Sequence, residues 1–255
     1  MEFEKLTKQE QESFIQEAVE SHRSNQAHEK YHKVVSGSYL KDMVYGAIDG
    51  IVTTFAVVAG VAGAALELKV VLILGFANLI ADGLSMAIGN FLGTRSENQF
   101  LARERMMEEW EVEHIPQEER KEIAAIYRGK GFGGESLDQV VAVITANKKV
   151  WVDEMMVHEL GMAPEATESP SKKGLATFIA FIIAGFLPIA PYAFGVQASF
   201  VLAMVMTAVA LFTVGSLRTY FTKQHWLIAG FEMLGVGALA AAAAYGVGYL
   251  IEALV

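Results

Sequence analysis

The chain has 255 residues, of which 53% are hydrophobic and none is cysteine, and its formal charge is −9 at pH 7. The apolar content is high for a soluble domain, and the acidic balance disfavours nucleic acid, which needs a concentrated basic surface. Without cysteine there can be no disulfide, no thiolate zinc site and no cysteine-held iron–sulfur cluster. Any metal site must therefore use carboxylates, imidazoles, amides or thioethers.

The first 37 residues form a polar arm without a cleavable signal pattern, because no apolar run follows a basic start. Residues 7–33 are predicted to form an amphipathic helix on the cytoplasmic side. In this arm Glu29 and His32 have the E-x-x-H spacing of di-iron helical bundles, and His28 lies one turn before His32. A metal site and a solvated helix face both remain open for this pattern.

Five apolar runs follow, each near or above the roughly 20 residues that a helix needs to cross about 30 Å of hydrocarbon. They cover residues 43–65, 70–93, 175–194, 196–217 and 226–251. We therefore expect an all-α membrane protein with five transmembrane helices, two within residues 38–94 and three within residues 174–255. Glycines are dense on the first, second and fifth runs, which predicts close helix packing.

Basic residues predict the sidedness of these spans. Nineteen of the 20 Lys and Arg residues lie in the N-terminal arm when Lys41 just after it is counted, in residues 95–173, or in the link between the last two spans. With five spans these regions share one side, and basic residues accumulate on the cytoplasmic side. We expect the C-terminus to lie across the membrane, which is a plasma membrane in a prokaryotic cell or alternatively a vacuolar membrane.

Residues 95–173 are predicted to form a cytoplasmic domain of three helices. The first continues from the second span to about Glu113, and the second starts at Pro116 and ends before Gly129. A long third helix is expected from a Ser136 cap to Leu160. The intervening GKGFGG segment lacks the spacing of a phosphate-binding loop, so we interpret it as a flexible link.

Polar side chains inside the spans are the first candidate site, because an ionisable group there is costly unless it faces a partner, a cavity or an ion path. The ionisable candidates are Asp42, Asp49, Asp82 and Glu232. Asn78, Asp82 and Met86 repeat every four residues and share one helix face. Oxygen ligands with a thioether suit Fe²⁺ better than Na⁺ or Ca²⁺, although ordinary packing explains Met86 unless Asp49 faces it. Proton transfer and structural pairing both remain open for the acids other than Asp49.

A second candidate site lies in the central domain, where carboxylates line up at helical spacing. The group comprises Glu104, Glu108 and Glu111 on the first helix, Glu119 and Glu122 on the second, and Met155, Met156 and Glu159 on the third. Like charges on one face repel unless a cation lies among them. The pattern therefore indicates either a solvated acidic face or a metal site, with His114, Asp153, Glu154 and His158 as further possible ligands.

Five segments carry a family resemblance, and they occur in order along residues 38–253. They are DGIVTTFAVVAGVAGA (49–64), ADGLSMAIGNFLGTRSE (81–97), WVDEMMVHELG (151–161), GFLPIAPY (185–192) and FEMLGVGALAAAAAY (231–245). Together they resemble the vacuolar iron transporter family. The resemblance implies five spans, a homodimer with the ion path at the subunit interface, and exchange of cytosolic Fe²⁺ for protons across the lipid bilayer rather than enzymatic catalysis.

The resemblance also implies roles for particular residues. The family's path residues match Asp49 and Met86, while Asn90 stands where several relatives carry an acid. The family's cytoplasmic metal ligands match Glu108, Glu111, Glu119, Glu122, Met155, Met156 and Glu159. Fe²⁺ is the implied transported ion, and these ligand types also accept Mn²⁺, Zn²⁺, Co²⁺ or Ni²⁺. A Mn²⁺ transporter of the same fold, a membrane-anchored di-iron protein and a non-transporting metal sensor remain the alternatives.

Overall fold

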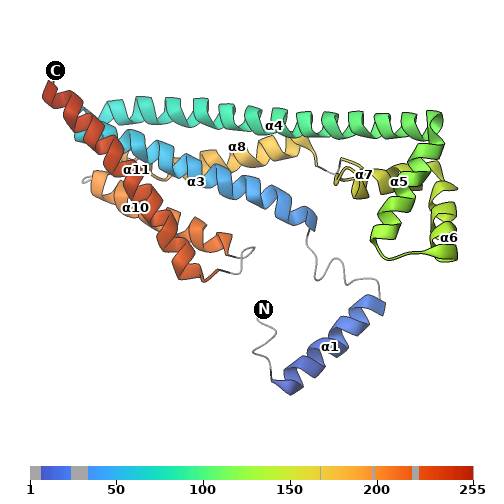
Figure 1. Ribbon diagram of the computed structural model, residues 1–255. Coiled ribbons are helices and arrows are strands. Elements are labelled where there is room, and N and C mark those ends of the chain that lie inside the picture. Colours follow the sequence, from blue (N-terminus) through green and yellow to red (C-terminus); the bar gives the residue numbers. More distant parts are fainter. Residues whose placement is uncertain (1–6, 24–33, 167, 197–198, 220–223, 255) are drawn as a thin grey trace. The chain divides into compact units, whose positions relative to one another are not determined.

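The computed structural model describes residues 7–23, 34–166, 168–196, 199–219 and 224–254. Their regular elements are all helices, which confirms the predicted all-α class (Figure 1). The chain divides into two compact units. We call residues 1–86 with 176–255 the apolar unit, and residues 87–175 the acidic unit. The acidic unit encloses the region 95–173 that the sequence singled out as a separate domain.

The N-terminal arm contains helix α1, Lys8–Arg23. Its apolar residues Ile15 and Val19 are exposed. The rest of the predicted helix 7–33, which includes the segment with the E-x-x-H spacing, lies outside the described residues.

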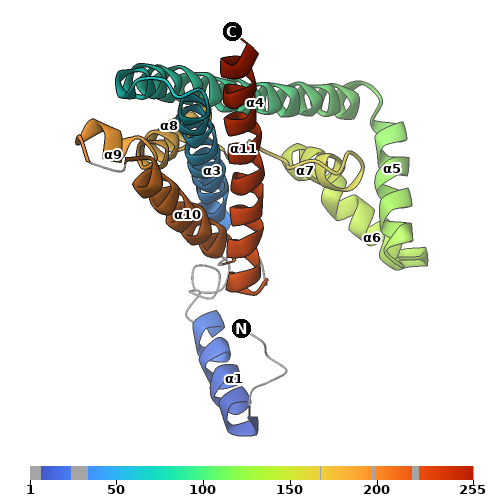
Figure 2. The ribbon, with the colours of Figure 1, turned by 90° about the vertical axis from the view of Figure 1, so that its left-hand side faces the viewer.

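Four described helices are long and apolar enough to cross a membrane by length and composition. They are α3 (Val34–Gly63), α4 (Leu68–His114), α10 (Ser199–Arg218) and α11 (Trp226–Leu254). Helices α3, α10 and α11 pack against one another in the apolar unit (Figures 1 and 2). These four helices correspond to the first, second, fourth and fifth predicted spans.

The third predicted span, residues 175–194, is not one helix. Helix α8 (Pro170–Phe186) ends early, and the four-residue helix α9 (Ala190–Ala193) follows after a turn. Pro188 explains the break, because proline has no backbone N–H to donate and its ring disfavours a helical residue before it, while Pro191 lies in the first turn of α9, where proline is tolerated. The prediction of a continuous helix was therefore wrong.

Glycines allow the backbones in the apolar unit to approach closely. A Cβ atom built at Gly46 would lie 2.5 Å from the Thr177 carbonyl oxygen, and one at Gly50 would lie 2.5 Å from that of Phe181. Any larger side chain would force α3 and α8 apart. This contact confirms the predicted close packing on the first span and fixes the helix that carries Asp49.

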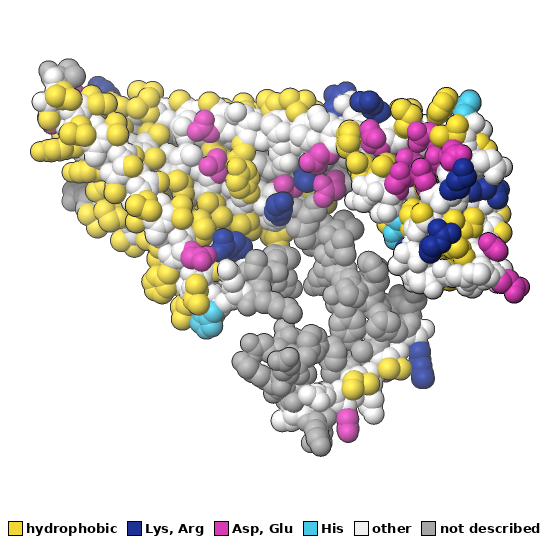
Figure 3. Space-filling view, in the orientation of Figure 1, with side chains coloured by type: hydrophobic (Ala, Val, Ile, Leu, Met, Phe, Trp, Pro, Cys, Tyr) yellow, Lys and Arg dark blue, Asp and Glu magenta, His cyan; other side chains and the backbone are white. Residues whose placement is uncertain are grey.

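The acidic unit holds the later part of α4 together with α5 (Pro116–Gly129), α6 (Gly134–Thr145) and α7 (Lys148–His158). Helix α4 is continuous, as predicted, and α5 has the predicted bounds to within one residue. Acidic side chains gather on this unit, whereas hydrophobic ones dominate the visible face of the apolar unit (Figure 3).

The predicted third helix of this region, residues 136–160, is instead two helices. Asn147 ends the continuity because its side-chain oxygen accepts hydrogen bonds from the backbone N–H groups of Lys149 (3.0 Å) and Val150 (3.3 Å). An asparagine that satisfies free N–H groups in this way starts a new helix. Ser136 is not the cap of α6 either, since it lies inside the first turn and its hydroxyl donates to the Gly133 carbonyl oxygen at 2.8 Å.

Candidate metal centre

Three glutamates from two helices come together in the acidic unit. Glu108 and Glu111 lie one turn apart near the end of α4, and Glu119 lies in the first turns of α5. The turn at Ile115 brings α5 back beside α4, so that one carboxylate oxygen from each glutamate lies within 4.8 Å of the other two. Carboxylate oxygens at this separation suit one divalent cation.

Two of these carboxylates are buried without compensation. The Glu108 and Glu119 residues are only 4% and 2% exposed. One oxygen of each is fully enclosed and has no hydrogen-bond partner among the described residues. Because an unpaired buried charge is costly, natural proteins neutralise it with a proton, a cationic partner or a metal ion. A solvated acidic face, the alternative left open by the sequence, does not describe these two side chains.

The glutamates also perturb one another's protonation. Burial, followed by repulsion from Glu159 and Glu119, raises the pKa of Glu108 to about 7. Burial, followed by repulsion from Glu122 and Glu111, raises the pKa of Glu119 to about 7 as well. At neutral pH the Glu108 and Glu119 carboxylates therefore exchange protons readily, and a bound cation would displace these protons.

Glu122 and Glu159 complete the cluster at its rim. Partial desolvation and repulsion from the neighbouring Glu122 raise the pKa of Glu159. The structure thus brings the five glutamates that the family resemblance implied into one electrostatic neighbourhood, whereas Glu104 of the spacing-based group takes no part in it. We call Glu108, Glu111, Glu119, Glu122 and Glu159 the glutamate cluster.

Met155 and Met156, the thioethers of the predicted set, are fully buried on α7. They pack in a core that includes Val112 of α4 and Ile123 of α5, which directly follow the cluster members Glu111 and Glu122 in sequence. The methionines therefore belong to the same core as residues next to the glutamates on α4 and α5. Packing and ligation are compatible uses of a flexible thioether.

The other possible ligands near the cluster have different partners. His114 stacks on Trp110 with ring centroids 4.4 Å apart. Glu154 accepts a hydrogen bond from the Tyr127 hydroxyl at 2.9 Å and lies 3.3 Å from His158 Nε2. Asp153 pairs with Arg105 at 2.6 Å. These side chains serve contacts around the cluster, and the sequence did not point to Arg105 because its partner lies 48 residues away.

Within the apolar unit, two of the predicted path acids, Asp49 of α3 and Asp82 of α4, interact electrostatically. Met86, one turn beyond Asp82, is partly buried against a core cluster that includes Phe181. Asp42 is buried on α3.

Asn78 occupies the same face of α4 as Asp82 and Met86, four residues before Asp82. Its side-chain nitrogen is buried and has no hydrogen-bond partner among the described residues. An unpaired buried amide is costly in an apolar environment. The Asn78 side-chain nitrogen is therefore a polar group without a hydrogen-bond partner among the described residues, on the helix face that carries Asp82 and Met86.

Glu232 lies in a different setting from the other path candidates. Its carboxylate accepts a hydrogen bond from Arg218 Nη2 at 2.6 Å, which ties α11 to the end of α10. Arg218 also contacts Gln224 at 3.3 Å. Of the two roles that the sequence left open for Glu232, the geometry shows structural pairing.

Four helices of membrane-spanning length and a buried carboxylate cluster define a membrane protein with a candidate cation site. Residues 40–249 match the VIT family. The chain therefore belongs to the VIT family, as the sequence motifs indicated.

Several relatives are similar over most of their length. The vacuolar iron transporter of Toxoplasma gondii is 38% identical over 239 residues, which cover 89% of this chain and 79% of the relative. Vacuolar iron transporter 1 of Arabidopsis thaliana is 32% identical over 219 residues, covering 85% and 88%. Vacuolar iron transporter 2 of Oryza sativa subsp. japonica is 31% identical over 244 residues, covering 94% and 98%. Their names describe transporters, which supports the expectation that this chain is not an enzyme.

Proposed function

We propose that this protein is a proton-coupled antiporter that moves Fe²⁺ out of the cytosol, either into a compartment or out of the cell. Membership of the VIT family and the names of its relatives support metal-ion transport. The observation that carries the proposal is a pair of buried carboxylates, Glu108 and Glu119, in a group of three oxygens within 4.8 Å. Each of the two has one oxygen without a hydrogen-bond partner in the described part of the chain.

In this proposal the glutamate cluster, with Met155 and Met156, collects Fe²⁺ from the cytosol. Carboxylates supply negative charge, and the softer thioethers favour Fe²⁺ over Ca²⁺ or Mg²⁺. Since Glu108 and Glu119 have pKa values raised to about 7, binding exchanges protons for metal near neutral pH. The cluster thus concentrates the ion without holding it irreversibly.

Asp49 and Met86 then coordinate the ion within the membrane. Asp42, Asp82 and Asn78 line the polar route in this account, and the electrostatic contact between Asp82 and Asp49 supports a shared role. Protonation of carboxylates on the far side releases the metal, because a carboxylate holds either a proton or a cation. Glu232 supports the structure through Arg218.

The proposed arrangement has five spans, with α8 and α9 together forming the third, and works as a homodimer. The N-terminal arm and the acidic unit face the cytosol, in line with the distribution of basic residues. At Gly89 and Gly93 of α4, no atom from another part of the described chain lies within 4 Å of the place of a Cβ, which leaves room for a partner helix.

The proposal is tested by metal uptake into liposomes that contain the purified protein and an imposed proton gradient. Fe²⁺ uptake should require the gradient and should collapse when a protonophore dissipates it. Uptake that is unchanged without a gradient would contradict proton coupling. No uptake at all, with metal still bound, would favour a sensor.

Selectivity is tested in the same assay by competition between Fe²⁺ and Mn²⁺. Carboxylates accept both ions, whereas thioethers add more to Fe²⁺. We expect Mn²⁺, and likewise Zn²⁺, Co²⁺ and Ni²⁺, to compete at higher concentrations than Fe²⁺ itself. Stronger competition by Mn²⁺ than by Fe²⁺ would establish the Mn²⁺ transporter instead.

A further inference from the structure

Helix α7 brings its ligands to the candidate metal centre from a different part of the chain. The glutamates of α4 and α5 follow one another closely in sequence, whereas Met155, Met156 and Glu159 arrive on α7 after a further helix. The apolar face of α7 packs in the core through Val152 and the two methionines. Apolar packing buries this face of α7, and the polar contacts that α7 makes with α4 add a further restraint on its position.

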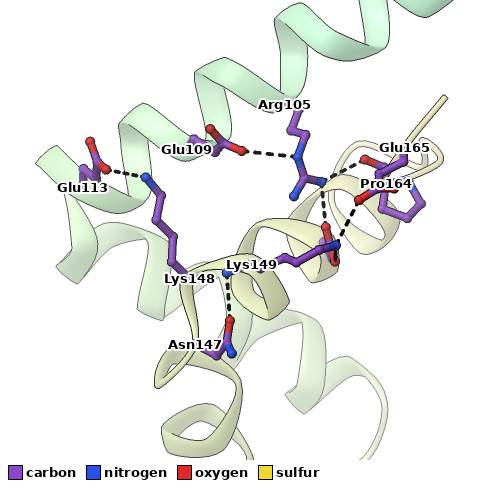
Figure 4. A network of polar contacts seen from close by, with 9 residues as sticks. Arg105, Glu109, Glu113, Asn147, Lys148, Lys149, Pro164 and Glu165 are labelled. Carbon is purple, nitrogen blue, oxygen red and sulfur yellow. Dashed lines mark hydrogen bonds and ion pairs between the residues drawn. The ribbon is translucent and has the colours of Figure 1, made fainter.

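The strongest of these contacts is made by Arg105 of α4 (Figure 4). Its Nη1 atom donates hydrogen bonds to Asp153 Oδ1 at 2.6 Å and to the Pro164 carbonyl oxygen at 2.8 Å. Its Nε atom pairs with Glu109 on its own helix at 3.2 Å. The Arg105 side chain is only 19% exposed. It therefore has a fixed geometry, unlike most surface ion pairs.

Asp153 is held from a second side. Lys149, one turn earlier on α7, donates to Asp153 Oδ2 at 2.9 Å and to Glu165 at 3.0 Å. Both oxygens of the Asp153 carboxylate are therefore engaged, Oδ1 by Arg105 and Oδ2 by Lys149.

A second ion pair joins the same two helices further along. Lys148 at the start of α7 donates to Glu113 near the end of α4 (Figure 4). The contacts at Arg105 and Glu113 lie eight residues apart on α4 and bracket Glu108 and Glu111. Helix α7 is therefore attached to α4 on both sides of the cluster, and Arg105 is the more buried of the two attachments.

We propose that Arg105 is a positioning residue of the metal centre, which sets α7 against α4 through Asp153 so that the α7 ligands face the glutamates. This inference rests on the proposed function of the glutamate cluster. Arg105 lies three residues before Glu108, and Asp153 lies two residues before Met155. A shift at the Arg105–Asp153 contact is therefore passed directly to both halves of the ligand set.

The inference makes a prediction about selectivity that general destabilisation does not. Loosening α7 removes thioether ligands and leaves the oxygen ligands of α4 and α5 in place. Co²⁺, which accepts sulfur, should then lose more affinity than Mn²⁺, which prefers oxygen. A residue that only stabilises the fold would lower binding of both ions in the same proportion.

The test measures Co²⁺ and Mn²⁺ binding by calorimetry on the full-length, metal-free protein in detergent. Arg105→Gln should weaken Co²⁺ binding about 10-fold, the scale for outer-shell partners of metal ligands, and should weaken Mn²⁺ binding less. Asp153→Asn should give the same pattern, and the double variant should be no weaker than either single one. Arg105→Lys should bind Co²⁺ more tightly than Arg105→Gln but less tightly than the wild type, since lysine keeps the positive charge but lacks the planar set of N–H donors of the guanidinium group.

Lys121→Gln is the matched control, because it also removes one positive charge from this unit but breaks only an exposed pair with Glu118. It should leave the Co²⁺ to Mn²⁺ affinity ratio unchanged. Equal losses for both ions in Arg105→Gln, or an unchanged ratio, would overturn the positioning role while wild-type binding still supports the metal centre. Absence of Co²⁺ binding in the wild type would instead overturn the proposed function. Circular dichroism checks folding, and Asp153→Asn decides the question if Arg105→Gln does not fold.

Discussion

The apolar unit and the acidic unit position their polar residues by opposite means. In the apolar unit, backbone contacts at Gly46 and Gly50 fix α3, and the polar residues stand singly or in pairs. In the acidic unit, ion pairs such as Arg105–Asp153 join the helices, and five glutamates share one region. In the proposed function, this difference corresponds to a division of labour, in which one unit accumulates cations and the other passes them on.

The largest expected effect comes from a change that disables the apolar unit alone. Asp49→Ala removes the central proposed membrane ligand and should abolish Fe²⁺ uptake into proteoliposomes. Co²⁺ binding to the glutamate cluster should stay at the wild-type level. Glu67→Gln is the control, because Glu67 is exposed in the same unit and its carboxylate pairs with the exposed Lys69 at 2.7 Å. Undiminished uptake by Asp49→Ala would contradict the assigned path.

The converse change disables the acidic unit. Glu119→Gln removes a buried ligand and should weaken Co²⁺ binding by at least about 10-fold, measured by calorimetry. Its neighbour Glu118 is exposed and paired with Lys121, so Glu118→Gln should have little effect. Equal losses in the two variants would indicate a diffuse acidic surface rather than a defined site.

The raised pKa values of Glu108 and Glu119, both about 7, predict pH dependence with two opposite signs. Metal binding needs the charged carboxylates, so Co²⁺ affinity should fall on the order of 10- to 100-fold from about pH 8 to about pH 6. Stability of the metal-free protein should change the other way. Because the folded state holds these protons more tightly than the unfolded chain, stability is greatest at low pH and is lost as the pH rises through about 7.

The pH prediction is checked by titration calorimetry and by thermal melting of the metal-free protein between about pH 5 and about pH 8. Glu119→Gln should flatten both profiles, because it removes one of the two groups. A wild-type melting temperature that rises with pH across this window would contradict the raised pKa values.

The close backbone contacts of the apolar unit predict a smaller effect, on stability. A Cβ atom at Gly248 of α11 would lie 2.1 Å from the Gly60 carbonyl oxygen, so Gly248→Ala should cost about 1–3 kcal/mol in the free energy of unfolding. Two residues earlier on the same helix, Gly246 has no such neighbour within 4 Å. Gly246→Ala should therefore be neutral or slightly stabilising in a thermal melt in detergent, and an equal loss in both would contradict the packing account.

The smallest expected effect concerns Glu232. Its pair with Arg218 is partly exposed, so Glu232→Gln should cost only about 0–1 kcal/mol in stability and should leave Fe²⁺ uptake unchanged. Arg218→Gln should behave alike, and the double variant should add little. A large loss of uptake in Glu232→Gln alone would return this residue to the ion path.

Much of the architecture was predictable because it depends on local patterns. Apolar runs of sufficient length predicted α3, α4, α10 and α11, and Pro116 marked the start of α5. The two helices that were predicted as continuous but are interrupted each contain a single residue that ends the helix. Asn147 could be read as an ordinary helical residue until its side chain was seen to cap α7, and Pro188 ended a helix that hydropathy alone would continue.

The glutamate cluster was predictable in composition but not in geometry. Helical spacing placed Glu108 and Glu111 on one face, but only the turn at Ile115 brings Glu119 to them. Burial of these carboxylates depends on packing between helices and has no local signature. The Arg105–Asp153 contact could not be predicted from the sequence either, because long-range ion pairs leave no periodic pattern in it.

The most direct test of the division of labour is Fe²⁺ uptake into proton-gradient liposomes, measured over a range of Fe²⁺ concentrations. We predict that Asp49→Ala shows no uptake at any concentration. The double variant Glu108→Gln/Glu119→Gln should reach the wild-type maximum but need about 10-fold more Fe²⁺ for half of it. Loss of the maximal rate in the double variant at an unchanged half-saturating concentration, or uptake by Asp49→Ala, would contradict the separation of binding and passage between the two units.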